Sequence, residues 1–426
     1  MDSRAFQSLN DDRQLWVSMD ATPDPPTDYL PQARRGALQV FVAFLKLGLT
    51  SFGGPIAHIA YFRQDLIVRR RWMDEAAYAD IVALCQLLPG PTSSQVGFAI
   101  GLSQAGVAGG VAAFAGFTAP SAIIMFAAAA GLPLLNGELG LALLHGLMLV
   151  AVSIVAQAVF GMARSFCKTP ATALVGLAAL VVVLVVSAAW VQPVVILAGG
   201  IIGLLVLPKK RSTPDPRGPH GNDSAGILLG VLAALLFFLP LLASGSSQGL
   251  LSVADAFYRS GAFVFGGGHV VLPLLEVETV GRGWLDQQAF LAGYGAAQAL
   301  PGPLFTFAGY LGAVSNSGAP AFIAGPLALA MIFLPGFLLV AAALPLWCRL
   351  RNRPGATAFT GGASASVVGL LAAALWDPVI RSAVLSPADI GIASLGFLLL
   401  QVFRAQPLVV IPLIVATSIG VDIAVT

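Results

Sequence analysis

Long apolar runs separated by short polar stretches make up most of this chain of 426 residues. A helix of about 20 residues crosses a bilayer, so each run is a candidate membrane segment. The runs lie at residues 36–62, 77–106, 107–132, 138–162, 170–187, 190–207, 225–245, 251–274, 287–315, 319–346, 356–376, 387–403 and 406–424. They lack the strand alternation of an outer-membrane barrel. The pattern therefore predicts an all-α polytopic membrane protein with about 13 hydrophobic segments.

Two polar stretches divide the chain into domains. Residues 1–35 contain six aspartates and four prolines but neither the basic start nor the apolar core of a signal peptide, which predicts a disordered cytoplasmic tail. Residues 208–224 are rich in proline, glycine and basic side chains, which indicates a cytoplasmic linker. The expected units are this tail, an N-terminal repeat at 36–207, the linker, a linking transmembrane helix at 225–245 and a C-terminal repeat at 246–426.

The two repeats share a set of landmarks that recur in the same order. At a displacement of 212 or 213 residues, Phe44 to Gly54 matches Phe257 to Gly267, Trp72 matches Trp284, Asp74 matches Asp286, and Gln86 to Pro91 matches Gln298 to Pro303. Several landmarks in one order indicate an internal duplication. Six runs in each half and one linking helix account for the whole pattern.

The basic residues predict how the two halves are oriented. Lysine and arginine concentrate in cytoplasmic loops, and the basic loops at 162–169, 208–224 and 347–355 can all face inside. The linking helix then makes the halves inverted, with a cytoplasmic N-terminus and a periplasmic C-terminus. Arginines at 34–35 and at 63–71 flank the first run on both sides. We therefore expect the glycine-rich run and the Pro-Gly-Pro run of each half to be broken helices or hairpins that return to their starting side.

Composition narrows the classes of function that the chain can have. Hydrophobic residues make up 57% and charged residues 10%, against roughly 25% charged in soluble domains, so the lipid bilayer is an expected partner. A net charge of +2 argues against a nucleic-acid partner. The three cysteines lack metal-ligand spacing, and we expect no metal or cofactor. No nucleotide-binding or catalytic motif stands out, which favours a transporter over an enzyme.

The paired Pro-Gly-Pro motifs at 89–91 and 301–303 are candidate binding elements. Proline removes a backbone donor and disfavours helix at the residue before it, so no continuous helix passes through. Such a break must be buried in protein or face a wet cavity. Thr92, Ser93 and Ser94 follow the first motif and predict a new helix start, which favours an anion. The second motif keeps Thr306 but loses most hydroxyls, so we expect unequal sites; a simple kink is the alternative.

Lys46 and Arg259 occupy equivalent positions inside apolar runs. A lysine and an arginine would together neutralise a divalent oxyanion, although snorkelling to the interface is the alternative. The Phe-Gly-Gly runs allow close backbone approach to a ligand or to another helix. The expected substrate-binding residues are Lys46, Arg259, Ser51, Gly53, Gly54, Gln86, Gly90, Thr92, Ser93, Gly266, Gly267, Gln298, Gly302 and Thr306. The candidates for proton coupling are His58, His269, Asp80 and Glu276, although a satisfied polar or interfacial role is the favoured interpretation of each.

Through the paired Phe-Gly-Gly and Pro-Gly-Pro motifs and the Trp72-Met73-Asp74 step, the chain resembles the chromate ion transporter family in its long, two-domain form. The resemblance covers about residues 36–424. It implies secondary active export of chromate across the bacterial inner membrane, chromate resistance and the proton-motive force as driver. Sulfate or another small oxyanion is the alternative substrate, and the chain could work alone or as a homodimer. One departure is that Gly268-His269 follows the second Phe-Gly-Gly where Pro55-Ile56 follows the first, so roles should not be copied between halves.

Overall fold

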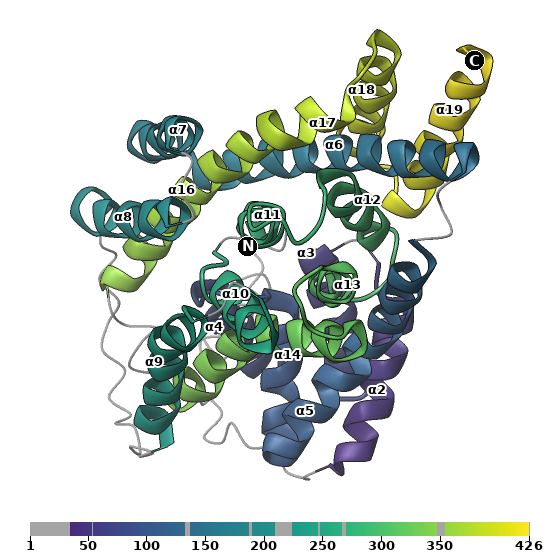
Figure 1. Ribbon diagram of the computed structural model, residues 1–426. Helices are drawn as coiled ribbons and strands as arrows, with labels where there is room; N and C mark the ends of the chain where they lie inside the picture. Colours follow the sequence, from purple (N-terminus) through teal and green to yellow (C-terminus); the bar gives the residue numbers. More distant parts are fainter. Residues whose placement is uncertain are drawn as a thin grey trace, which may run out of the picture.

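The computed structural model describes residues 35–52, 54–132, 137–186, 190–208, 224–245, 248–265, 270–346 and 354–425. Within these ranges every regular element is a helix, as Figure 1 shows. Five helices are long and apolar enough to cross a membrane, at 92–131, 139–166, 225–243, 321–346 and 355–383. Shorter apolar helices make up most of the remaining runs, so the expected count of about 13 full segments is not confirmed. The predicted tail and most of the predicted linker lie outside the described residues.

The first runs of each half are broken into short helices. In the first half these are α2 (Ala37–Thr50), α3 (Gly54–Phe62), the π-helix η2 (Arg63–Arg69), α4 (Glu75–Leu87) and α5 (Thr92–Gly131). In the second half they are α10 (Leu250–Ala262), α11 (Val271–Thr279), α12 (Gln287–Gln298), the 3₁₀ turn η5 (Leu304–Thr306), α13 (Phe307–Val314) and α14 (Ala321–Ala343). Helix α5 is itself two helices, because the backbone leaves the helical region at Ala105 and Gly106.

The broken runs of the first half fold back as two hairpins. The backbone N–H of Arg35 donates to the carbonyl of Gln104 at 3.2 Å, and the Gln104 side chain donates to the carbonyl of Trp72 at 3.1 Å. The start of α2, the end of η2 and the middle of α5 therefore meet at one place. Both the glycine-rich run and the Pro-Gly-Pro run return to the end from which they set out, as the arginine pattern predicts.

The second half repeats this arrangement. Gly249 N–H donates to the carbonyl of Ser317 at 2.5 Å, and Asn316 N–H donates to the carbonyl of Trp284 at 2.7 Å. These contacts close two hairpins at their stems, leaving Val264 and the Pro-Gly-Pro segment toward the tips. The recurring aspartates of the sequence are helix N-caps: Asp74 accepts from Ala77 N–H and Asp286 from Ala289 N–H, both at 2.7 Å.

The remaining helices are exchanged between the halves. They are α6 (Glu138–Phe166), α7 (Pro170–Val185), α8 (Val191–Val206), α16 (Pro354–Ala374) with its extensions η7 (Leu375–Ile380) and α17 (Arg381–Ala383), α18 (Pro387–Gln401) and α19 (Pro407–Val425). Helices α7 and α8 of the first half pack on α16, and α18 and α19 of the second half pack on α6 (Figure 1). Glycines bring α8 and α16 together, with Gly203 against Gly362. The linking helix α9 (Ser224–Ala243) lies against α10 and α14.

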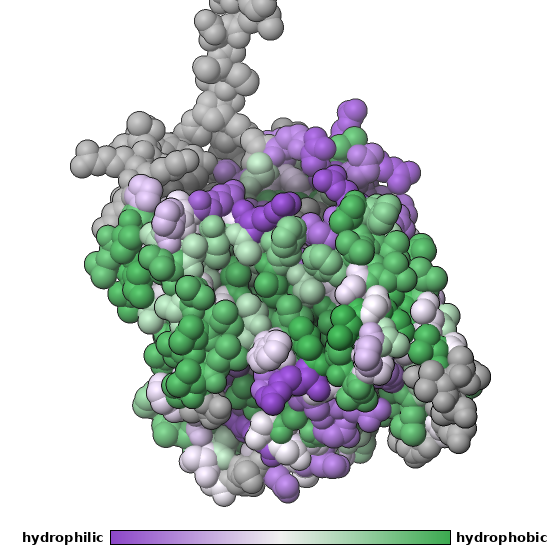
Figure 2. All heavy atoms as spheres, turned by 90° about the horizontal axis from the view of Figure 1, so that it is seen from above, coloured by the Kyte–Doolittle hydropathy of each residue, from purple (hydrophilic) through white to green (hydrophobic). Residues whose placement is uncertain are grey.

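An aromatic seam joins the halves at the centre. Phe98 of α5 stacks on Phe337 of α14 with ring centroids 4.4 Å apart, and Phe114 of α5 lies 4.9 Å from Phe333 of α14. Such ring pairs contribute about 0.5–1.5 kcal/mol each beyond the burial of their area. Outside this core, Figure 2 shows a broad apolar band between two polar regions of the surface. This band is the surface that a bilayer would cover.

Candidate functional site

The hairpin tips of the two halves meet through a reciprocal pair of backbone hydrogen bonds. Gly90 N–H donates to the carbonyl of Val264 at 2.7 Å, and Gly302 N–H donates to the carbonyl of Ser51 at 2.9 Å. Gly90 corresponds to Gly302 in the repeat, and Ser51 corresponds to Val264. Each Pro-Gly-Pro tip therefore binds the residue just before the Phe-Gly-Gly motif of the opposite half, as an approximate two-fold relation between the halves requires.

The glycines at these two crossings have the backbone conformation that favours glycine. Their φ angles are +126° at Gly90 and +96° at Gly302. Both residues are buried, so each Pro-Gly-Pro interruption lies within the protein and its central N–H has a protein partner. A Cβ atom at Gly302 would lie 2.9 Å from Ser121 Oγ and 3.2 Å from the carbonyl oxygen of Phe117. The second-half tip therefore rests directly on α5 of the first half.

Buried polar side chains of the first half surround this contact. His58 on α3 and Ser93 at the start of α5 are 1% and 4% exposed, and His58 Nδ1 lies 3.2 Å from Ser93 Oγ. The His58 ring packs edge-on against Phe117 with centroids 5.2 Å apart. Ser51 Oγ, His58 Nε2 and Thr118 Oγ1 are buried and have no hydrogen-bond partner among the described residues. A buried polar atom without a partner usually costs about 1–3 kcal/mol, so three such atoms on residues at or next to the Gly302 crossing indicate a place built for a ligand or water.

The two membrane cations, Lys46 and Arg259, lie on the hairpin stems and are ion-paired. Lys46 Nζ is 3.3 Å from Asp65 Oδ1, and Arg70 Nε is 2.6 Å from Asp65 Oδ2. The side chain of Lys46 is 51% exposed and that of Asp65 is 9% exposed. The Arg70 guanidinium also lies over the Trp72 ring, 5.9 Å from its centroid. This stem cluster has more cations than carboxylates, because Arg69 also lies 3.5 Å from Asp65.

The second half has an equivalent stem cluster with a different charge. Arg259 contacts Asp255 at 2.8 Å and Glu278 at 2.9 Å, and Arg282 contacts Glu278 at 2.5 Å and Asp255 at 3.3 Å. Two arginines thus face two carboxylates. Sequence reasoning did not pair any carboxylate with these cations, although a signal exists: an acidic partner follows its cation by 19 residues both in Lys46–Asp65 and in Arg259–Glu278.

Comparison with known proteins agrees with this two-part architecture. A sequence profile of the family described as "Chromate transporter" matches residues 38–204 and again residues 251–421. The chain belongs to the chromate transporter family. Its relatives include a chromate transport protein of Pseudomonas aeruginosa, 29% identical over 80% of each chain. The chromate transport protein of Cupriavidus metallidurans is 25% identical over 87% of this chain and 90% of that one. No solved structure matches the chain.

An uncharacterized transporter of Methanocaldococcus jannaschii is also similar, at 29% identity over 74% of this chain and 78% of that one. Membership of the chromate transporter family, together with the long apolar helices, makes this a multi-pass membrane protein of the transport class.

The other residues that the sequence analysis predicted as site residues lie at several separate places in the chromate transporter fold. Thr92 is half-buried at the start of α5, and the Thr306 hydroxyl donates to the carbonyl of Pro303 at 3.0 Å. Gln298 is half-buried with its Nε2 unpartnered among the described residues, whereas Gln86 is exposed on α4. Gly54 begins α3, and Asp80 is half-buried on α4. Gly53, Gly266, Gly267 and His269 lie outside the described residues.

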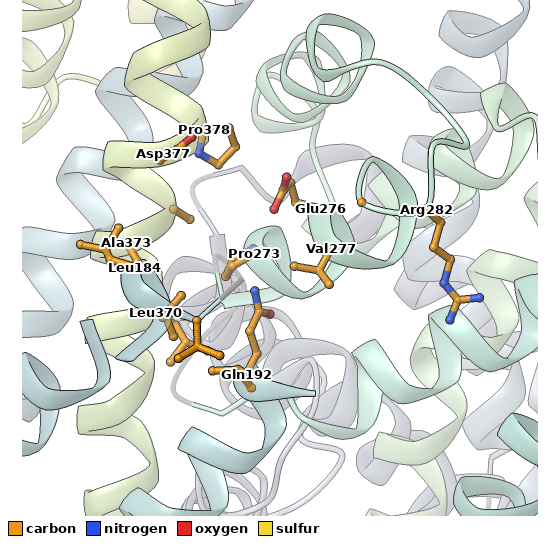
Figure 3. Close-up of a pocket in the computed structure, with 15 residues that line it drawn as sticks. Leu184, Gln192, Pro273, Glu276, Val277, Arg282, Leu370, Ala373, Asp377 and Pro378 are labelled. Atoms are coloured by element: carbon orange, nitrogen blue, oxygen red, sulfur yellow. The ribbon is translucent and has the colours of Figure 1, made fainter. Parts of the chain in front are cut away.

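Glu276, a predicted proton-coupling residue, lines a separate cavity of about 430 Å³. Figure 3 shows Glu276 of α11 and Asp377 of η7 on facing walls, with Gln192 of α8 below them. Arg282 also lines this cavity in part, but its guanidinium points away toward the stem cluster (Figure 3). The carboxylates would repel an anion, so this cavity is a poor candidate for an oxyanion site.

Proposed function

We propose that this protein is a secondary active carrier that exports chromate from the bacterial cytoplasm across the inner membrane, driven by the proton-motive force, and thereby confers chromate resistance. The observation that carries the proposal is the reciprocal contact of the hairpin tips, Gly90 with Val264 and Gly302 with Ser51. Broken helices that meet inside a protein bring helix starts to a place where a membrane protein can hold a dehydrated ion. The names of the relatives in Pseudomonas aeruginosa and Cupriavidus metallidurans support chromate as the substrate.

The architecture supports alternating access as the mechanism. In our proposal the halves are inverted, so the hairpins of one half enter from the cytoplasm and those of the other from the periplasm. The tips then meet near the middle of the membrane. Rocking of one half against the other would break the crossing hydrogen bonds in turn and open the tips to either side. The N-terminus would be cytoplasmic and the C-terminus periplasmic.

Proton coupling would involve titratable groups that lie close to the hairpins of the two halves. His58 belongs to α3 directly after the first tip, and Glu276 belongs to α11 of the second half. The cavity that Glu276 shares with Asp377 would give protons a route toward the second stem. Sulfate, which has the same shape and charge as chromate, is the alternative substrate.

Chromate uptake into everted membrane vesicles tests this function. We expect vesicles that contain the protein to accumulate chromate when a proton gradient is present, and a protonophore to abolish the accumulation. Excess sulfate in the same assay distinguishes the two anions, since a sulfate carrier would take up labelled sulfate and lose chromate uptake in competition. Uptake equal to that of vesicles without the protein would refute the proposal.

A further inference from the structure

This inference rests on the proposed function and deepens it by locating the anion. The start of α5 is the first element that points to a location. Its N-cap residue, Pro91, makes no side-chain capping bond, so no side chain there satisfies the first N–H groups of the helix. Together with the helix dipole, such free donors favour a negative charge. The dipole of a helix start contributes at most about 2 kcal/mol, so side-chain donors must complete a site for an anion.

Unpartnered side chains of the first half can supply these donors. Ser51, His58 and Thr118 are 0%, 1% and 2% exposed, and each has a polar atom without a partner among the described residues. The His58 ring touches Phe117, and Thr118 follows Phe117 in the chain. Ser51 is held at the same place through Gly302, which lies against the Phe117 carbonyl. If Nδ1 of His58 accepts the Ser93 hydroxyl proton, the imidazole N–H is left at Nε2, where it can donate to an anion.

The equivalent region of the second half has apolar side chains at the positions of these polar groups. The repeat replaces Ser51 by Val264, His58 by Val271 and Ser93 by Phe305. Gly48 packs on the carbonyl of Phe117 and Gly261 on the carbonyl of Ile332, which makes Phe333 the counterpart of Thr118. The rings of Phe305 and Phe333 lie 5.6 Å apart, and both are buried. Aromatic packing therefore fills the place that is polar in the first half.

The two cations inside apolar runs form ion pairs on the hairpin stems, away from the tips. Lys46 is paired with Asp65, and Arg259 is paired with Asp255 and Glu278, all on the hairpin stems. Among the residues that the structure describes, neither cation forms a hydrogen bond to Ser51, His58 or Ser93. Charge on the stems can draw an anion toward the protein over a distance of about a Debye length, but the groups left to hold it at the tips are neutral donors.

We propose that the chain holds one tetrahedral dianion, in the first half only, between the start of α5 and the tip at Gly302. The ligands are the hydroxyls of Ser51 and Thr118 and the imidazole N–H of His58, which Ser93 orients by donating its own proton to Nδ1. The second half contributes the Gly302 tip, which covers the site from the opposite side. The anion is thus bound by hydrogen bonds and a helix start, with no direct ion pair.

The variants Ser51→Ala and Thr118→Val test this site, because each removes an oxygen that has no protein partner. In anion-free buffer the purified full-length variants should unfold at the same temperature as the wild type or higher, since no protein hydrogen bond is lost. Chromate and sulfate should raise the unfolding temperature of the wild type, and the double variant should lose most of that rise. In everted vesicles each single variant should raise the KM for chromate about tenfold or more, as expected for a lost bond to a charged group.

His58→Leu should raise the KM in the same way, and His58→Gln, which keeps an N–H donor, should recover part of the loss. Ser315→Ala is the matched control: its hydroxyl is buried in the second half and donates to the carbonyl of Gly312, and its removal should leave the KM unchanged. Folded variants that bind and transport chromate like the wild type would overturn the inference while leaving the proposed function in place. A wild type that neither binds nor transports chromate or sulfate would overturn both.

Discussion

Removal of Arg259 should destabilise the protein, whereas removal of the equivalent Lys46 should change its stability little. Arg259 lies 2.8 Å from Asp255 and 2.9 Å from Glu278, whose side chains are 4% and 9% exposed. Arg259→Ala leaves two buried carboxylates facing Arg282 alone. Breaking a buried ion pair by removing one partner costs about 3–5 kcal/mol, and we expect the lower end because Arg282 stays within 3.3 Å of both.

Lys46 differs from Arg259 because its side chain is 51% exposed and because its partner, Asp65, is also paired with Arg70. After Lys46→Ala, Asp65 still accepts from Arg70 Nε at 2.6 Å. Exposed ion pairs contribute roughly 0–1 kcal/mol, so the free energy of unfolding should change by no more than that. Lys46→Ala is therefore the variant that tests the predicted attraction of substrate, because its transport can be compared with the wild type at equal amounts of folded protein.

Thermal unfolding of the purified protein, followed by size-exclusion chromatography after heating, measures both effects. The double variant Arg259→Met, Glu278→Met supplies the control, since it removes one cation and one anion and leaves Arg282 paired with Asp255. It should recover more than half of the stability that Arg259→Ala loses. If Arg259→Ala unfolds at the wild-type temperature, or if the double variant is no more stable than the single one, the stem cluster does not stabilise the second half as we argue.

Three further predictions concern the tips, the topology and the caps. Gly302→Ala forces a side chain onto a φ of +96° and against Ser121, which should cost about 1–2 kcal/mol and reduce transport, whereas Gly226→Ala, with open space around it, should do neither; chromate uptake and thermal unfolding measure both. On a background without native cysteines, Glu75→Cys and Gln288→Cys should react with a membrane-impermeant thiol reagent from opposite faces, and labelling from one face would exclude inverted halves. Ser386→Ala removes the capping box at the start of α18 and should lower stability by about 1 kcal/mol in the same unfolding assay, while unchanged stability would show that the cap is redundant.

The features that depend on local chemistry could be predicted from the sequence. Proline cannot continue a helix, so the breaks at 89–91 and 301–303 follow from residue type alone, and the arginines on both sides of the first run indicate that the run turns back. The two breaks differ in hydroxyl content, and their surroundings in the structure differ accordingly. Ser93, after the first break, lies beside the buried His58, whereas its counterpart Phe305 packs on Phe333. The number of full membrane segments could not be obtained in this way, because a broken run and a spanning run are equally apolar.

The features that depend on pairing across the chain were not predicted. Asp65 lies beyond a helix break from Lys46, so helical spacing gives no sign of their contact. Thr118 lies inside an apolar run and is recognised only once the structure brings it beside Phe117 and the Gly302 tip. The exchange of α7 and α8 onto α16 depends on close contacts such as Gly203 with Gly362. Small residues of this kind allow a helix to pack but do not specify which neighbour it packs on.

The way the halves are joined explains how one fold can be symmetric in shape and asymmetric in chemistry. The crossings at Gly90 and Gly302 use backbone N–H and carbonyl groups, which every residue type at Ser51 or Val264 supplies equally. Substitution of the side chains around one crossing therefore leaves the joint itself intact. The first half can keep a histidine and hydroxyls beneath its crossing while the second half fills the same place with phenylalanine. A carrier built in this way needs both halves to close over the anion, but it needs ligands from only one of them.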